Sequence, residues 1–181
     1  MSATTLLLQS LDSSRRSMLD AVRDFSAPEL AHRAGPRCRS CGQVLGSAAV
    51  ADREVLRYLG VDSLPTVPAG FEARFARWGI GDDDGAPSHG SLPEKFASHR
   101  DVLIRAVEEL APDALDEPVD PPEHLDEEAV FRFETVGEMI MATAGFTHSL
   151  VGEVSVIRLA LGMSELADPF GDPGGGSNHV G

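Results

Sequence analysis

Residues 145–162, GFTHSLVGEVSVIRLALG, form the end of a proline-free stretch that begins near Thr135. At about 100° per residue, a set of mostly apolar side chains falls within about 40° of one line on a helix. This set is Met139, Thr143, Phe146, Leu150, Val154, Ile157 and Leu161. The spacing predicts a helix over about 135–162 with one face in a hydrophobic core.

The opposite side of this helix is also poor in charge. It carries Met141, Gly145, His148, Gly152, Ser155 and Leu159. The two glycines and the serine would let another helix approach closely. We therefore expect burial on two sides, with the helix either central in a bundle or paired across the seam of a symmetric homodimer. His148 is expected to lie in that helix contact, because a lone histidine is seldom a metal ligand.

Three further long helices are expected. Apolar residues spaced from Leu7 to Phe25 predict the first, over about 4–25, and a serine cap followed by a proline in SAPEL predicts a short helix after it. Ser40 with Gln43 is a capping box that opens the second long helix, which ends near Gly60.

Two more capping boxes complete the pattern. Thr135 with Glu138 opens the quoted helix, and Ser91 with Glu94 opens the third long helix. The inner stripe of that third helix is expected to be Leu92, Phe96, His99, Leu103, Ala106 and Leu110.

The connections are long. Residues 61–90 are rich in Gly, Pro and Asp and predict a loop, with FEARFARW as one or two helical turns inside it. Residues 111–128 predict an acidic connection, AVFRF after it a short extended piece, and residues 166–181 a flexible glycine-rich tail. The fold class is therefore all-α, a four-helix bundle in one domain over 1–165.

Composition excludes several partners. The 181-residue chain is 42% hydrophobic, carries a net charge of −14 and has no Lys/Arg cluster, so nucleic acid and anionic membranes are poor partners. The opening residues do not resemble a signal peptide, and nowhere do about 18 apolar residues run together. We expect a cytoplasmic protein.

Seven segments in this order resemble the DinB superfamily, which includes thiol-dependent maleylpyruvate isomerases and bacillithiol transferases. They are LDSSRRSMLDAV, SAPEL, SCGQVLGSAAVADREVL, FEARFARWG, SLPEKFASHRDVLIRAVEEL, ETVGEMI and GEVSVIRLALG, and they cover roughly residues 4–163. The resemblance implies a DinB-like bundle, a divalent metal such as zinc or nickel held by three histidines, and a low-molecular-weight thiol as cofactor.

The three metal positions of that family fall on residues without the expected ligands. In SCGQVLGSAAVAD, the family pattern aligns with Ser40, Gly42, Gly46 and Asp52 and places a histidine position on Ser47. In FTHSLVGEVSVIRLALG, it aligns with Gly152, Arg158 and Gly162 and places the other two on Phe146 and Leu150. A phenyl ring and an isobutyl group offer no lone pair, and a single hydroxyl is a poor ligand, so we expect a degenerate site without metal.

His99 is the one weak catalytic candidate. It lies on the inner stripe of the third helix, where it could hydrogen-bond Ser47 as a structural histidine or act as a general base. Cys38 and Cys41 form a CxxC motif, and Cys41 in the first helical turn could be a reactive thiolate. Two free structural thiols are the other interpretation, which we favour.

Three functions remain open. We expect a DinB-like, non-catalytic protein with a binding or structural role, a homodimer through the fourth helix, that needs no cofactor. The enzymatic alternative is a thiol-dependent S-transferase or isomerase with relocated ligands or with His99 as its base. A small-molecule binder is the third, with a pocket lined by Trp78 and Phe71 or Phe75.

Overall fold

The computed structural model describes residues 1–75, 89–119 and 133–163, and within these ranges the chain is all-α, with no β-strand. The two isolated β-bridges, Arg33 with Ser40 and Pro118 with Thr135, do not extend into strands. The α-helices of the described ranges are α1 (Ala3–Val22), α2 (Ala27–Ala31), α3 (Cys41–Tyr58), α4 (Phe71–Phe75), α5 (Leu92–Glu109) and α6 (Val136–Ala160). Two 3₁₀ helices, η1 (His89–Ser91) and η2 (Pro112–Asp116), precede and follow α5.

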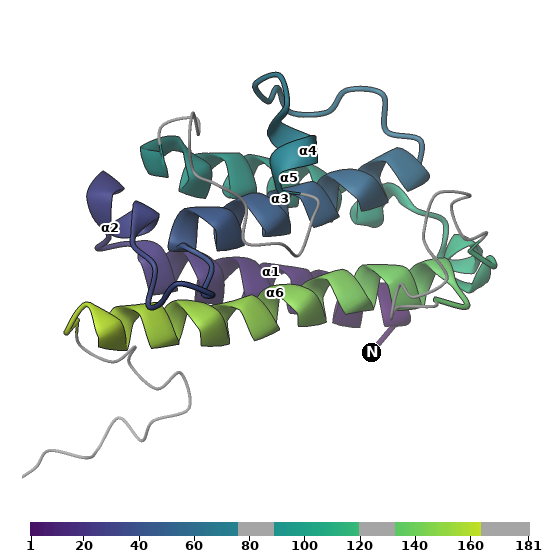
Figure 1. The fold of residues 1–181 in the computed structure, drawn as a ribbon. Helices are drawn as coiled ribbons and strands as arrows, with labels where there is room; N and C mark the ends of the chain where they lie inside the picture. Colours follow the sequence, from purple (N-terminus) through teal and green to yellow (C-terminus); the bar gives the residue numbers. More distant parts are fainter. Residues whose placement is uncertain (76–88, 120–132, 164–181) are drawn as a thin grey trace, which may run out of the picture.

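The long helices lie side by side (Figure 1). α1 packs against α5 and α6, and α3 packs against the same two helices. α1 and α6 run in one direction, because Arg158 near the end of α6 contacts Ala21 near the end of α1. α3 and α5 run in the opposite direction, so the connection from the end of α3 to the start of α5 has to span the length of the helices. The end of α5 and the start of α6 lie in the same hydrophobic cluster, so that connection joins neighbouring ends.

Most helix starts agree with the sequence. Ser40 and Gln43 form the expected capping box, and the side chain of Thr135 accepts a hydrogen bond from the Glu138 N–H. Glu138 bonds the backbone N–H of Glu134 rather than that of Thr135. The expected cap at Ser91 is wrong, because η1 runs directly into α5 and leaves Ser91 in a helical conformation without a side-chain cap.

The interior has two hydrophobic clusters with a polar layer between them. One cluster contains Met18, Leu45, Phe96 and Leu150, and the other contains Leu11, Leu56, Leu103 and Ile140. The layer holds Ser14, Asp52, His99, Arg100 and Thr147, all with 0% exposure. Each long helix therefore switches from apolar to polar and back along its buried face.

The connections between the long helices contain short helical segments. The acidic connection is not wholly irregular, because its first residues form η2. One turn of FEARFARW is helical, as α4. Most of AVFRF and all of residues 166–181 lie outside the described ranges, as does Trp78.

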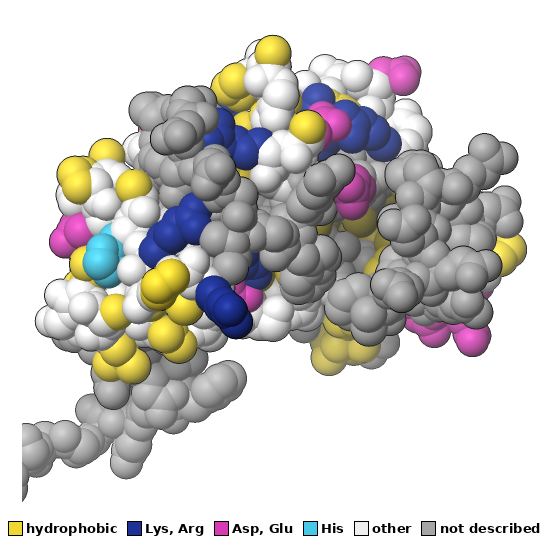
Figure 2. Space-filling view, in the orientation of Figure 1, with side chains coloured by type: hydrophobic (Ala, Val, Ile, Leu, Met, Phe, Trp, Pro, Cys, Tyr) yellow, Lys and Arg dark blue, Asp and Glu magenta, His cyan; other side chains and the backbone are white. Residues whose placement is uncertain are grey.

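The expectation that α6 sits centrally in the bundle is wrong. Its inner stripe is buried or half-buried as predicted, but Met141, Gly145, His148, Gly152 and Leu159 are exposed. A Cβ atom added at either glycine would meet no atom within 4 Å. Hydrophobic side chains gather at the C-terminal end of α6 in the space-filling view (Figure 2), and Val156 and Leu159 are 56% and 59% exposed. Within the described ranges, five of the six residues on this second side of α6 are exposed and Ser155 is half-buried.

By length and composition alone, α6 is the single helix of the described ranges that could cross a membrane. It packs along its length on α1 and α3, and its Arg158 is buried in an ion pair with Asp24. One such helix is weak evidence for a membrane span.

Candidate functional site

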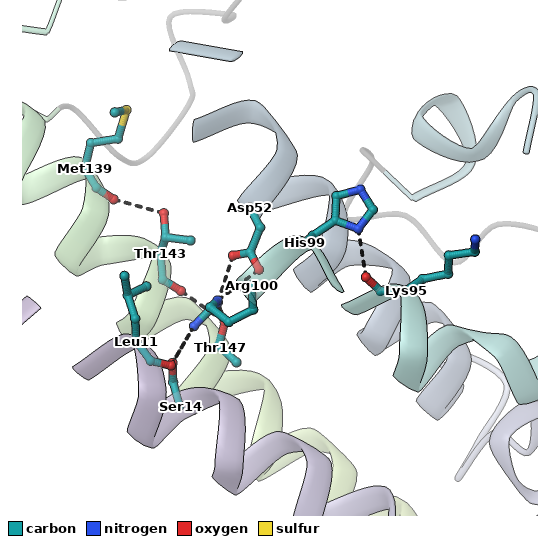
Figure 3. A network of polar contacts seen from close by, with 9 residues as sticks. All are labelled: Leu11, Ser14, Asp52, Lys95, His99, Arg100, Met139, Thr143 and Thr147. Atoms are coloured by element: carbon teal, nitrogen blue, oxygen red, sulfur yellow. Dashed lines mark hydrogen bonds and ion pairs between the residues drawn. The ribbon is translucent and has the colours of Figure 1, made fainter. Parts of the chain in front are cut away.

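The centre of the polar layer is the guanidinium group of Arg100 (Figure 3). Its Nε and Nη2 donate to the two carboxylate oxygens of Asp52, at 2.9 and 2.8 Å. Nη2 also donates to Thr147 Oγ1, at 2.7 Å. Nη1 donates to Ser14 Oγ and to the carbonyl oxygen of Leu11, at 2.5 and 3.3 Å. One side chain therefore joins all four long helices.

This arrangement satisfies every donor of the guanidinium, because an arginine has five N–H bonds and five acceptor contacts are present. The acceptors are themselves held in place. Ser14 donates onward to Leu11 and Thr147 to Thr143. Burial raises the pKa of the Asp52 carboxyl, and the adjacent Arg100 opposes that rise. While these contacts are in place, Arg100 has no N–H group left to donate to a ligand.

Sequence patterning missed Arg100. The predicted inner stripe of α5 contains Ala106 and Leu110 but not Arg100 or Val107. In the structure Arg100 and Val107 are buried, whereas Ala106 and Leu110 are half-buried. In the sequence, Asp52 stands out only as the acidic residue that ends the motif SCGQVLGSAAVAD. The sequence feature that could have indicated the layer is the presence of an Asp and an Arg on the predicted buried faces of two helices. A buried charge is costly unless an opposite charge pairs with it, so these two residues would be expected to pair.

His99 is fully buried beside this layer and does not bond Ser47 as expected. Its Nδ1 lies 2.7 Å from the carbonyl oxygen of Lys95, so Nδ1 donates. Arg53 Nη1 then donates to Nε2, at 3.4 Å. Burial lowers the pKa of His99, and the nearby Arg53 lowers it further. The imidazole is held neutral with both nitrogens engaged, which fits a structural histidine better than a general base.

Arg53 belongs to a group of side chains that holds the 61–75 segment against α3. It donates to the carbonyl of Pro65 at 2.7 Å and to the carboxylate of Glu72 on α4 at 2.5 Å. Arg57 donates to the same carboxylate, and these two arginines hold the pKa of Glu72 below its ordinary value. α4 is thus clamped to α3 by charge.

Ser47, the first of the aligned metal positions, is buried and engaged on both sides. Its Oγ donates to the carbonyl oxygen of Phe75 at 3.2 Å and accepts a hydrogen bond from Arg39 Nη1 at 3.4 Å. Arg39 in turn forms a two-bond ion pair with Glu153 of α6. A guanidinium, which cannot bind a cation, therefore lies at this position. Nothing in the sequence pattern predicts Arg39 and Glu153 as partners, because they lie 114 residues apart.

The other two positions lie on the apolar face of α6. Leu150 is fully buried in the cluster that contains Leu45 and Phe96, and Phe146 is half-buried against the same cluster. Among the residues that the structure describes, no three His, Cys, Asp or Glu side chains are grouped so that they could hold a metal ion.

Two of the aromatic residues expected to line a pocket are buried in a hydrophobic cluster. Phe71 and Phe75 are 2% and 5% exposed, and their ring centroids are 4.7 Å apart. The Phe75 ring lies directly on Gly46, where a Cβ atom would come within 2.3 Å of it. The third expected member, Trp78, is outside the described residues, so the pocket as a whole stays a prediction.

The two thiols differ in environment. Cys38 is exposed, whereas Cys41 is fully buried in the first turn of α3. Burial raises the pKa of Cys41 to about 12. Burial therefore opposes the thiolate at Cys41 that the helix N-terminus and the nearby Arg158 would favour.

Arg158, aligned with an arginine of the family motif, has a structural position. Its Nη1 donates to the carbonyl oxygen of Ala21 at 3.0 Å, and its guanidinium forms a two-bond pair with Asp24. This pair lowers the pKa of Asp24. The contact ties the last turn of α6 to the end of α1.

Comparison with known proteins gives no relative: no family model, no curated protein and no solved structure matches this chain.

Proposed function

We propose that this chain is a DinB-like four-helix bundle whose metal site is replaced by structural contacts, and that it acts as a non-catalytic binding or structural protein in the form of a homodimer. The single observation that carries the proposal is the contact between Arg39 and Ser47. Ser47 stands at one of the three aligned metal-ligand positions, and the Arg39 guanidinium lies within hydrogen-bonding distance of it. A metal ion bound there would therefore lie close to a positive charge. Repulsion between the two charges opposes such binding.

The rest of the interior supports the same conclusion. Each polar group that could serve chemistry there is already engaged: Arg100 by five acceptors, His99 by Lys95 and Arg53, and Ser47 by Arg39 and Phe75. A catalytic group must lie within hydrogen-bonding distance of the reacting atom. These side chains could do so only after breaking the hydrogen bonds they now form. The polar residues inside this bundle therefore favour a role in holding it together.

The surface that supports a homodimer is the outer side of α6. Met141 and Leu159 are 42% and 59% exposed, and the stripe that joins them contains no charged side chain. In a chain of net charge −14, an uncharged strip is where two like-charged copies can meet without direct repulsion. A cytoplasmic location is part of the proposal, and the free thiols of Cys38 and Cys41 suit a reducing compartment.

The enzymatic alternative stays a prediction with a clear requirement. For His99 to accept a proton at Nε2, the hydrogen bond from Arg53 would have to break. His99→Ala should leave thiol-transfer and isomerase assays unchanged if the histidine is structural. A loss of activity in a folded His99→Ala protein would favour the enzyme.

Equilibrium sedimentation tests the homodimer. We expect a reversible dimer whose dissociation constant rises at least about tenfold in Leu159→Glu, because burying one unpaired carboxylate per copy costs more than about 1.4 kcal/mol. Leu6→Glu is the matched control, since Leu6 is 45% exposed on α1 and lies outside the stripe. A monomer at all concentrations, or equal effects of the two substitutions, would overturn the homodimer.

A further inference from the structure

The outer stripe of α6 has a regular spacing. Its members are separated by four, three, four, three and four residues: Met141, Gly145, His148, Gly152, Ser155 and Leu159. This is the heptad spacing with which two helices keep one seam in contact over several turns. At about 1.5 Å per residue the stripe is about 27 Å long. It is long enough for an extended helix-to-helix contact.

The spacing of the stripe is also symmetric about its centre. The two residue numbers of each pair Met141 and Leu159, Gly145 and Ser155, and His148 and Gly152 are centred on position 150. If two copies of α6 lie antiparallel about a two-fold axis at that level, each residue meets its counterpart in the second copy. Large apolar side chains then meet at both ends, small residues meet between them, and each imidazole faces a glycine. In a parallel arrangement each residue would lie opposite the same residue of the second copy, so the two His148 imidazoles would face each other.

The charges of α6 permit this contact. The helix has three acidic or basic residues, and each is engaged within its own chain. Glu138 accepts from the backbone of Glu134, Glu153 pairs with Arg39, and Arg158 pairs with Asp24. The exposed strip between them is therefore neutral. The rest of the chain, with its large negative charge, would repel a second copy at most other faces.

We infer that two copies of this chain pair through α6 in an antiparallel register, with Gly145 of one copy opposite Ser155 of the other and His148 opposite Gly152. This inference rests on the homodimer proposed above and adds its geometry. Glycine and serine at these positions let the two helix axes approach closely.

Site-specific disulfide formation tests the register. In a Cys38→Ser background, Gly145→Cys and Ser155→Cys proteins are prepared separately, mixed and oxidised, and covalent dimers are measured on non-reducing gels. The mixture should cross-link, because the two cysteines lie at the same level. Either protein alone should not, because identical cysteines would be about 15 Å apart along the axis, beyond the roughly 7 Å between Cα atoms that a disulfide spans.

A mixture of Gly145→Cys and Leu159→Cys serves as the register control, with its cysteines about 6 Å out of step; it should cross-link far less than the first mixture. Efficient cross-linking of Gly145→Cys with itself would overturn the antiparallel register and leave the homodimer standing. A dimer by light scattering without any of these cross-links would place the contact elsewhere. A monomer by light scattering would overturn the homodimer as well.

Discussion

Asp52 on α3 and Arg100 on α5 form a two-bond ion pair in which both side chains have 0% exposure. The pair lies between two hydrophobic clusters, and Arg100 also bonds residues of α1 and α6. An ion pair taken out of water contributes less net stability than its geometry suggests, but the loss of one partner is severe. Because the Asp52–Arg100 pair contacts residues of all four long helices, it fixes how these helices are aligned along their length.

Substitution of Arg100 should show how strongly the stability of the fold depends on this ion pair. Arg100→Met leaves the buried Asp52 carboxylate without its partner and removes one hydrogen bond each from Ser14, Leu11 and Thr147. We expect the free energy of unfolding to fall by about 3–5 kcal/mol in urea denaturation. The double variant Arg100→Met/Asp52→Leu should recover a large part of that loss. Asp101→Ala, which breaks the half-exposed Arg15–Asp101 pair, should cost no more than about 1 kcal/mol. Equal losses in all three proteins would contradict the account of the layer.

A clash is expected when a methyl group is added at Gly46. Its Cβ would lie 2.3 Å from the Phe75 ring, so Gly46→Ala should lower the free energy of unfolding by about 1–3 kcal/mol despite the better helix propensity of alanine. In a double-mutant cycle, Phe75→Leu should relieve part of the penalty. Additive effects of the two substitutions would show that the ring and the glycine are not in contact.

Stability should fall on acidification because of His99. Burial lowers its pKa in the folded chain, so from about pH 6.5 downward the unfolded chain binds a proton that the folded chain does not. The contribution is present above pH 6.5 and is lost as pH falls toward the lower folded value. Urea denaturation from pH 8 to pH 5 should therefore show a smaller pH dependence in His99→Gln than in the wild type. Replacement of exposed His32 by Gln is the control, and an identical pH dependence in both variants would argue against a buried neutral His99.

The thiols should react one at a time. Cys38 is exposed and should be alkylated rapidly at pH 8, whereas Cys41, with a pKa raised to about 12, should react only when the chain unfolds. Mass spectrometry of native protein should therefore find one modified cysteine, and Cys38→Ser should show none. Rapid modification of Cys41 in folded Cys38→Ser would restore a reactive-thiol interpretation.

The helices were predictable because their signals are local. The apolar spacing of α6 and the capping residues Ser40 and Thr135 act within one or a few turns, and the structure contains these elements close to the expected positions. Ser91 failed as a cap because the preceding residues also adopt a helical conformation, which a pattern of two residues does not reveal.

The polar interior was harder to predict because its signals are not local. Arg100 interrupts an apolar stripe, and only its partners on three other helices make burial favourable. The same reason applies to Arg39, whose partner Glu153 is more than one hundred residues away in the sequence. By contrast, periodicity alone predicted that Phe146 and Leu150 lie on the apolar face, which the structure confirms, with Phe146 half-buried.

The metal content of the purified protein tests the central claim most directly. A genuine three-ligand site retains about one zinc or nickel ion per chain through dialysis. With Arg39 beside Ser47 and with Leu150 in the hydrophobic core, we predict far less than one ion of any transition metal per chain, and no change in thermal stability when zinc or nickel is added. One tightly held ion per chain that stabilises the fold would contradict the account.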